Sequence, residues 1–217
     1  MNASQANPSG RTRALVHNRD REREVLAAAH RVFVERGFSR ATIAEIATLA
    51  RVAEGTIYRF AATKRELLER VIVDWYRGLM DQLRAQLEAA PDTRERLRLF
   101  CRHQFTIFTD HAAVSRLLVR ELRASADYRN SPLHEANRAY TKLFIELIES
   151  GQAARELRGD LSTTLLRDLF FGTIEHATLA GPDARTRADR EAEFFGFFWS
   201  LVVQPNDPMR HTPNRPA

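Results

Sequence analysis

The chain has 217 residues, of which 44% are hydrophobic, so it can bury a sizeable core in one or two domains. No stretch reaches the roughly 20 apolar residues of a membrane-spanning helix, and the N-terminus lacks the apolar core of a secretion signal. We therefore expect a soluble, cytoplasmic protein. A single cysteine, Cys101, excludes an internal disulfide and a multi-cysteine zinc site.

The formal net charge of +5 is unevenly distributed. Residues 1–65 contain 11 Arg and one Lys against six acidic residues, a balance of +6, whereas the remainder has 21 basic and 22 acidic residues. Because contacts to phosphate gain free energy from counterion release, this distribution favours a polyanion that binds only the first third of the chain. A solvated, arginine-rich surface is the alternative explanation of the charge alone.

The two ends of the chain lack apolar periodicity. We expect residues 1–18, which include Pro8, Ser9 and Gly10, to form a disordered arm, and residues 205–217 to form a disordered tail. Between them the sequence predicts an all-α protein of nine helices, with no competing strand pattern.

The first helix is predicted at residues 20–36, where apolar residues recur at three- and four-residue spacing until Gly37. Thr42 followed by Glu45 is a capping-box pattern and predicts the start of a short second helix. The third helix, EGTIYRF at 54–60, can bury Ile57 and Phe60 while Thr56, Tyr58 and Arg59 face outward.

Thr63 with Glu66 repeats the capping pattern and starts a long fourth helix that Pro91 ends at about residue 89. Asp92 and Glu95 predict another cap. Five further helices are expected at 93–109, 112–124, 131–151, 161–180 and 187–203. The last two are apolar on nearly every side, so we expect a homodimer formed through these two helices.

The second and third helices, joined by a short turn in the basic part of the chain, form a helix-turn-helix pattern. The third helix would enter the major groove of DNA, where Gly55, Thr56, Tyr58 and Arg59 have suitable sizes and hydrogen-bonding groups. Thr42 and Lys64 lie at helix starts, where backbone N–H groups, a hydroxyl or an ammonium can bind phosphate. We therefore expect a DNA operator as partner.

The segment ATIAEIATLARVAEGTIYRFAATKRELL resembles the N-terminal signature of the TetR family of bacterial transcriptional regulators, and the match extends over residues 25–72. The resemblance implies an Ω-shaped, all-α homodimer with an N-terminal helix-turn-helix domain at 19–65. It also implies a ligand-binding and dimerisation domain at 66–204, where a ligand changes the separation of the two DNA-reading helices. DNA contacts carry over to Thr42, Thr56, Tyr58, Arg59 and Lys64.

Three positions depart from the family pattern. Arg51 replaces the glycine of the turn, so it strains the turn if the position needs a positive φ, and it places a cation near the DNA backbone. Ala53 replaces a serine cap, which removes about 1 kcal/mol of helix stabilisation. Ala61 replaces an aromatic residue, which thins the packing between the third and fourth helices.

Three stretches of the C-terminal domain, LVRELR, E-x-G-x-x-x-x-E-L and FGTIEH, resemble TetR-type repressors of fatty-acid degradation that respond to long-chain acyl-CoA. Such an effector needs an apolar tunnel with cations at its mouth. Arg120 or Arg123 could bind the CoA phosphates, and His176 could contact the ligand or the partner subunit. Aromatic residues at helical spacing belong to an ordinary core more often than to a pocket. With that alternative, the candidate tunnel residues are Phe105, Phe108, Leu118, Phe144, Phe170, Phe171 and Ile174.

Catalysis is not expected. Cys101 and His103 are two residues apart on a helix and point in different directions, and the seven histidines show no metal-ligand spacing. No cofactor is predicted. We expect a DNA-binding repressor that leaves its operator on binding an apolar effector. The alternative is a lipid-binding or carrier protein of the same fold without DNA recognition, but a carrier has no need for the basic first third of the chain.

Overall fold

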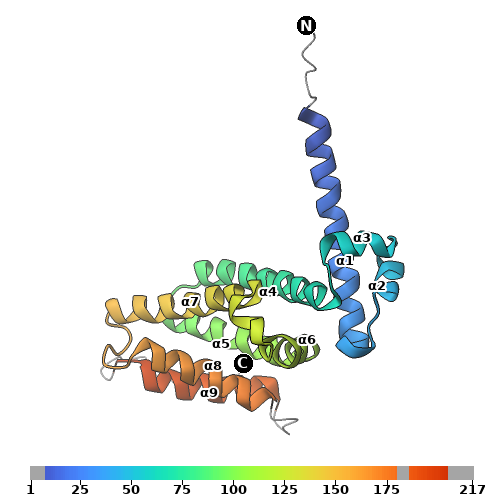
Figure 1. Ribbon diagram of the computed structural model, residues 1–217. Helices are drawn as coiled ribbons and strands as arrows, with labels where there is room; N and C mark the ends of the chain where they lie inside the picture. The colour runs from blue at the N-terminus through green and yellow to red at the C-terminus, as the bar shows by residue number, and fades with distance from the viewer. Residues whose placement is uncertain (1–7, 180–185, 205–217) are drawn as a thin grey trace. The chain divides into compact units, whose positions relative to one another are not determined.

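The computed structural model describes residues 8–179 and 186–204, with side chains for 18–177 and 186–204 (Figure 1). The predicted C-terminal tail lies outside these residues. The described part of the chain contains nine α-helices and no strand, apart from an isolated bridge between Leu157 and Val203. The all-α prediction is therefore confirmed. None of the described helices is long and apolar enough to cross a membrane.

The helix boundaries agree closely with the predicted ranges beyond the first helix. They are α1 Pro8–Arg40, α2 Ile43–Ala50, α3 Glu54–Phe60, α4 Lys64–Ala89, α5 Thr93–Thr109, α6 Ala112–Leu117, α7 Pro132–Ala153, α8 Thr163–Leu179 and α9 Arg187–Val202. The predicted helix at 112–124 divides into α6 and a π-helical segment, η1, at Leu118–Arg123. A short 3-10 helix, η2, follows at Ala126–Asn130.

Helix α1 corrects one prediction. It begins at Pro8 rather than near residue 20, so the disordered arm predicted for residues 1–18 is wrong over residues 8–18. Proline is well suited to the first turn of a helix, and extending an existing helix costs far less than nucleating one, so no apolar face is needed. The predicted end is supported, because Gly37 has φ 73° and ψ 168° and kinks the helix.

The chain folds into two units. The first contains the residues up to Trp75 together with Leu117–Ser125, and the second contains Tyr76–Arg116 and the residues from Ala126 onward. The boundary lies within α4, later than the predicted boundary after residue 65, because the first turns of α4 complete the core of the first unit. Leu67 and Leu68, at the start of α4, are fully buried.

The first unit is a small helical core around α1. Helix α1 packs against α2, and α2 packs against α3. Its fully buried side chains come from the apolar positions that the sequence pattern selected, including Val25, Ala29, Ile46 and Ile57. The η1 segment belongs to this unit: Leu118 and Leu122 are buried, and the Arg65 guanidinium donates to the carbonyl of Glu121.

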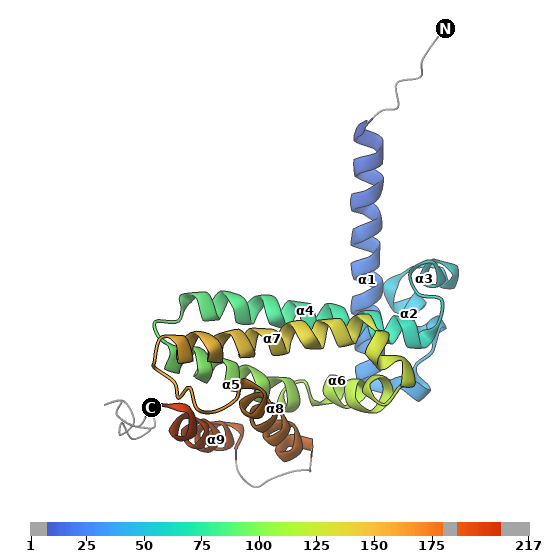
Figure 2. The same ribbon diagram turned by 60° about the vertical axis from the view of Figure 1, so that its left-hand side comes forward.

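In the second unit, α5 packs against α7, α8 and α9 (Figure 2). Helices α5 and α9 are antiparallel, since their paired residues step by four in opposite directions. Arg94 lies 5.6 Å from the Trp199 ring centroid and Arg98 lies 4.8 Å from that of Phe195. Further along, Arg102 forms an ion pair of 3.2 Å with Glu191, and Arg187 donates to Thr106 at 3.0 Å.

Candidate functional site

The start of α2 is fixed by the predicted capping box. The Thr42 hydroxyl accepts the Glu45 N–H at 3.2 Å, and the Glu45 carboxylate accepts the Thr42 N–H at 3.1 Å. Thr42 is exposed beside the first turn of the helix. Its position is therefore rigid and open to solvent, as a phosphate contact requires.

The turn after α2 depends on a left-handed residue. Arg51 has φ 55° and ψ 43°, a conformation in which glycine has no steric penalty. The turn closes as a Schellman motif. The Val52 N–H donates to the carbonyl of Ala47 at 3.0 Å, and the Arg51 N–H donates to the carbonyl of Thr48 at 3.2 Å. The strain predicted for Arg51 is confirmed, and we place its cost at about 1 kcal/mol.

Helix α3 separates a buried side from an open one. Ile57 is completely buried, whereas Tyr58 is 52% exposed and Arg59 is exposed beside it. Gly55 is also exposed, while Thr56 is half-buried. Ala53 provides no side-chain cap at the start of α3, as predicted. The short helix therefore depends on packing at Ile57 to present its outer face.

Lys64, the first residue of α4, has a role that the sequence did not indicate. Its ammonium donates to the carbonyls of Phe38 at 2.8 Å and Ala41 at 2.9 Å, and a third contact reaches Ser39 at 3.4 Å. It also lies 4.7 Å from the centroid of the Phe38 ring. These bonds connect α4 to the segment just before Thr42, so the ammonium is already engaged within the unit.

The cap predicted from Thr63 and Glu66 is present in a modified form. The Thr63 hydroxyl accepts the Glu66 N–H at 3.0 Å, but the Glu66 carboxylate accepts the N–H of Ala62, at 2.8 Å, rather than that of Thr63. The Ala62 N–H and, next, the hydrogen bond from Arg70 lower the pKa of Glu66. Ala61, which replaces the family's aromatic residue, is buried at the end of α3.

The second unit contains a cluster of aromatic rings contributed by α5, α7, α8 and α9. Phe144 and Phe170 are stacked with centroids 4.5 Å apart, and Phe171 lies 5.3 Å from each of them. The remaining members are Phe100, Tyr140, Phe194 and Phe198. Three of the predicted tunnel residues therefore meet in one apolar cluster, which is chemically suited to an acyl chain.

A polar chain borders this aromatic cluster. Nε2 of His103 lies 3.0 Å from the carbonyl of Leu79, which can only accept, so Nε2 carries the proton and Nδ1 accepts from Tyr140 Oη at 2.9 Å. Tyr140 Oη is also 3.0 Å from Oε1 of Gln104. One hydroxyl proton cannot serve both acceptors, so a turn of the Gln104 amide that presents its NH₂ group to Oη satisfies all three side chains.

Burial keeps the His103 ring neutral. Desolvation is the largest cause that lowers its pKa, to about 4. From the sequence, His103 was a candidate only for a catalytic base, and no role was predicted for Gln104 or Tyr140. The signal that could have found this network is a pair of polar residues, His103 and Gln104, between Phe100 and Phe105 on a largely apolar helix.

The other predicted effector residues are more scattered. Phe105, Phe108 and Ile174 are buried in the second unit, where the Phe105 ring lies 6.1 Å from that of Phe194. His176 is exposed on α8. The predicted tunnel residue Leu118 and the predicted cations, Arg120 and Arg123, lie in η1 of the first unit, not in the unit that contains the aromatic cluster.

The described side chains give no support to a catalytic cysteine or a metal site. Cys101 is buried, and desolvation raises the pKa of its thiol, so it is a poor nucleophile. Within residues 18–177 and 186–204, no group of three or more His, Cys, Asp or Glu side chains could bind a metal ion.

Comparison with known proteins matches both parts of the chain. Residues 25–71 match the family described as "Bacterial regulatory proteins, tetR family", and residues 90–178 match "Tetracyclin repressor-like, C-terminal domain". The chain belongs to the TetR family. TetR-family proteins are transcriptional regulators, so the predictions of a DNA-binding regulator and of no enzymatic activity are confirmed.

Two relatives of the chain are named as regulators. The chain is 23% identical over 161 residues to the "Fatty acid metabolism regulator protein" of Bacillus subtilis, covering 74% of this chain and 83% of that one. It is 25% identical over 167 residues to the "HTH-type transcriptional repressor KstR2" of Mycobacterium tuberculosis H37Rv, covering 75% and 84%. The predicted resemblance to fatty-acid regulators is thereby confirmed.

A solved structure supports the TetR fold of the chain. The transcriptional regulator FadR of Bacillus subtilis, in complex with stearoyl-CoA, superposes with a TM-score of 0.71 and 20% identity. The superposition covers 81% of this chain and 96% of FadR. At this identity the likeness establishes the fold, and the ligand of FadR is a property of that protein.

Proposed function

We propose that this TetR-family regulator is a homodimeric repressor that leaves its operator on binding a long apolar effector, with long-chain acyl-CoA as the first candidate. The observation that carries the proposal is the geometry of α3, which buries Ile57 completely and leaves Tyr58 and Arg59 exposed. A buried anchor between exposed hydrogen-bonding groups suits a helix that reads the major groove.

The dimer part of the proposal is supported by the surface of α8 and α9. Leu165 and Leu169 are 49% and 39% exposed, and Phe197 on α9 is 64% exposed. Leu165, Leu169, Thr173 and His176 recur at three- and four-residue spacing and are all exposed, so they form one face of α8. A second copy of the same helices would remove this apolar surface from water.

The effector part is supported by the aromatic cluster and by the relatives. The rings of Phe144 and Phe170 are in direct stacking contact, so an acyl chain that enters between them must separate α7 from α8. Ligand binding at this position would therefore change the packing of the second unit. A ligand that binds only one packing arrangement shifts the protein toward it, which is how an effector would release DNA.

The test begins with selection of a bound site from random duplex DNA, followed by titration of that duplex in a gel-shift assay. Tyr58→Ala and Arg59→Ala should abolish specific binding while leaving the far-UV circular dichroism and the dimer unchanged. Unchanged affinity in both variants would reject α3 as the reading helix.

Stearoyl-CoA added to the wild-type complex should then release the duplex, whereas free CoA at the same concentration should not. Release by neither compound would reject acyl-CoA as effector and leave DNA binding standing. Purified protein that retains a lipid but binds no duplex would instead favour a carrier.

A further inference from the structure

The aromatic cluster of the second unit borders a pair of polar side chains. On α5, Gln104 follows Phe100 by four residues, and on α7, Tyr140 precedes Phe144 by four, so each polar residue shares a helix face with a ring. The ring centroids of Phe100 and Phe144 are 5.4 Å apart, and Tyr140 Oη lies 3.0 Å from Gln104 Oε1. The polar pair therefore forms a layer one helical turn, roughly 6 Å, from the aromatic pair.

The Gln104 amide is buried and has hydrogen-bonding capacity to spare. Gln104 is only 4% exposed, and Tyr140 Oη is the one hydrogen-bond partner of its side chain among the described residues. With the NH₂ group turned toward Oη, one N–H and the amide oxygen are left without a partner. Buried polar groups are normally paired, so a ligand that brings a carbonyl or hydroxyl oxygen would complete this amide.

The orientation of the amide is fixed by the bonds behind it. Nε2 of His103 donates to the carbonyl of Leu79 at 3.0 Å, and Nδ1 accepts the hydroxyl proton of Tyr140 at 2.9 Å. Tyr140 Oη has no second proton, so it can only accept from Gln104. The free N–H and oxygen of the amide are therefore held in defined positions beside the rings.

The surroundings of the polar pair carry no balancing charge. The side chains that act electrostatically on Tyr140 are Tyr76 and Cys101, and His111 acts on His103, so no Arg, Lys, Asp or Glu is among them. A carboxylate placed here would be buried without a cation, which costs far more than burying a neutral oxygen. The layer therefore suits thioesters, esters, ketones and alcohols better than free acids.

Phe171 on α8 lies where an apolar chain could reach both layers. Its ring is only half-buried, whereas Phe144 and Phe170 are fully buried. The Phe171 centroid is 5.7 Å from that of Tyr140 and 5.3 Å from that of Phe144. A chain that displaces this ring would contact the aromatic and polar layers together and leave the hydrogen bonds between α5 and α7 intact.

We infer that Gln104, oriented by Tyr140 and His103, selects the effector by its polar group: it hydrogen-bonds an uncharged carbonyl or hydroxyl oxygen on a long apolar chain and rejects a free carboxylate. The inference rests on the proposed function and deepens it by naming the part of the effector that is recognised. The thioester of a long-chain acyl-CoA and the hydroxyl group of another lipid share this chemistry.

The first test titrates the full-length protein with stearoyl-CoA and with octadecyl-CoA, the thioether that has the same chain but lacks the carbonyl oxygen. The wild type should bind stearoyl-CoA about tenfold more tightly, as one hydrogen bond provides. Gln104→Leu, a change to an apolar side chain of similar size, should remove this preference by weakening stearoyl-CoA alone. Gln86→Leu, the same change at an exposed position on α4, should keep it.

The second test uses ligands without CoA: dodecanol, chlorododecane, which lacks the hydroxyl, and dodecanoate. The wild type should bind dodecanol about tenfold more tightly than chlorododecane, and Gln104→Leu should lose this difference. Dodecanoate should bind about a hundredfold more weakly than dodecanol. A preference for dodecanol without binding of either CoA compound would support the inference and identify a hydroxylated lipid as its source.

Tyr140→Phe provides a second variant in case Gln104→Leu does not fold, which circular dichroism would show. It retains the ring but releases the amide, so it should reduce the preference for the ligand that carries oxygen. A merely structural role of Tyr140 would weaken both members of a pair equally and leave their ratio unchanged.

A wild type with no preference in either pair, dodecanoate bound as tightly as dodecanol, or a preference that survives in Gln104→Leu would overturn the inference. Release of the duplex by stearoyl-CoA would in that case still support the proposed function. If none of these ligands binds, the effector part of the proposed function fails together with the inference, and DNA binding is unaffected.

Discussion

The Tyr140 hydroxyl and Nδ1 of His103 lie 2.9 Å apart and join α7 to α5 beside the aromatic cluster. Nε2 of the same ring bonds the Leu79 carbonyl, so one neutral imidazole connects three helices. This arrangement holds only while His103 is uncharged, because a second ring proton would face the hydroxyl proton of Tyr140 and the charge would be buried.

We therefore expect the second unit to lose stability at mildly acid pH. Burial lowers the pKa of His103 in the folded state from 6.5 to about 4, so the unfolded state binds more protons between these values. The contribution of neutral His103 to the free energy of unfolding should be fully present above about pH 6.5. It should fall by about 3 kcal/mol in total as the pH approaches 4. Urea unfolding at several pH values measures this.

His103→Gln provides the comparison for that experiment, because it retains a polar side chain but cannot titrate. Its free energy of unfolding should be lower than that of the wild type at pH 7.5 but should change less between pH 6.5 and 4. If the two proteins show the same pH dependence in this window, His103 is not the group responsible.

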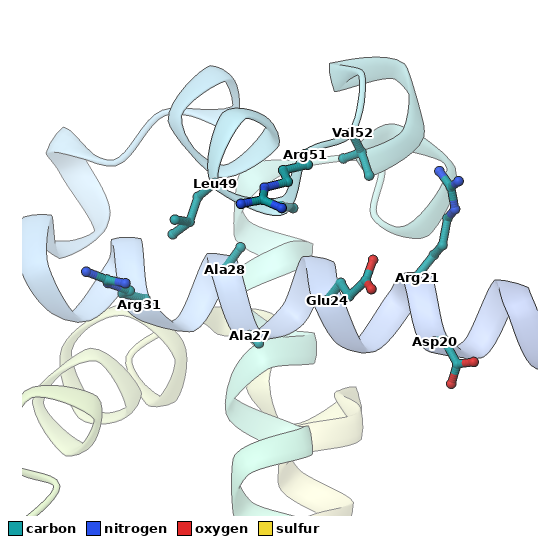
Figure 3. Close-up of a pocket in the computed structure, with 10 residues that line it drawn as sticks. Asp20, Arg21, Glu24, Ala27, Ala28, Arg31, Leu49, Arg51 and Val52 are labelled. Carbon is teal, nitrogen blue, oxygen red and sulfur yellow. The ribbon is translucent and has the colours of Figure 1, made fainter.

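Replacing Arg51 by glycine should change stability and DNA affinity in opposite directions. Arg51→Gly relieves the left-handed strain at φ 55° and should stabilise the first unit by about 1 kcal/mol. It also removes an exposed cation from the open groove that Arg51 lines between α1 and the end of α2 (Figure 3), so the operator should bind more weakly and with a smaller salt dependence. Thermal unfolding and salt-dependent titration measure the two effects.

Ala53→Ser is the control for Arg51→Gly. It adds the missing cap of α3 and should also stabilise the unit by about 1 kcal/mol, but it leaves the charge unchanged. A gain in stability without a change in the salt slope would separate the two effects. Arg51→Gly with wild-type affinity would show that Arg51 does not contact DNA.

Lys64 should act on DNA binding through the fold of the first unit rather than by direct contact of its ammonium with phosphate. Lys64→Met retains most of the aliphatic side chain but cannot form the bonds to Phe38 and Ala41, and should cost about 2 kcal/mol of stability. Hydrogen exchange at residues 38–42 should accelerate.

The salt slope distinguishes the two roles of Lys64. At a temperature where the variant is fully folded, its slope should match that of the wild type, whereas Arg59→Ala should lower the slope. A lower slope for Lys64→Met with unchanged unfolding would instead identify Lys64 as a phosphate contact.

The apolar face of α8 and α9 should determine the oligomeric state. Phe197→Glu places a charge on a side chain that is 64% exposed in the single chain, so the protomer should still fold. The same charge would be buried in a dimer and should dissociate it.

Light scattering after size-exclusion chromatography should give a monomer for Phe197→Glu and a dimer for the control, Lys142→Glu. Lys142 lies on α7, and its side chain is 74% exposed. Two monomers, or two dimers, would contradict this assignment of the interface.

The sequence predicted helix caps and buried helix faces correctly, because both depend on residues only a few positions apart. The capping bonds of Thr42 and Asp92 are formed within three residues. The positive φ of Arg51 was indicated only by the glycine that the family has at this position. The buried faces of α2 and α3 follow from helical periodicity, so the spacing of Ile46 and Ile57 is enough to assign both to the core.

The prediction for residues 8–18 was wrong because apolar periodicity reports burial rather than helicity. A helix that is already formed can be extended without an apolar face, so the lack of apolar periodicity at residues 8–18 did not exclude a helix there. The predicted effector residues do not all lie in one unit, for a different reason. Leu118, Arg120 and Arg123 lie in η1, which belongs to the first unit, whereas the aromatic cluster belongs to the second.

The all-α class, the helix-turn-helix and the exposure of Tyr58 and Arg59 could be predicted from the sequence alone, since each depends on periodicity and capping within a few residues. Three other relationships arise from helix packing: Lys64 bonds to Phe38 and Ala41, neutral His103 lies between Leu79 and Tyr140, and Arg21 and Arg51 line one groove. These relationships connect residues that are 23 to 37 positions apart in the first two cases. Pairing at such separations depends on how the helices pack, which no local pattern encodes.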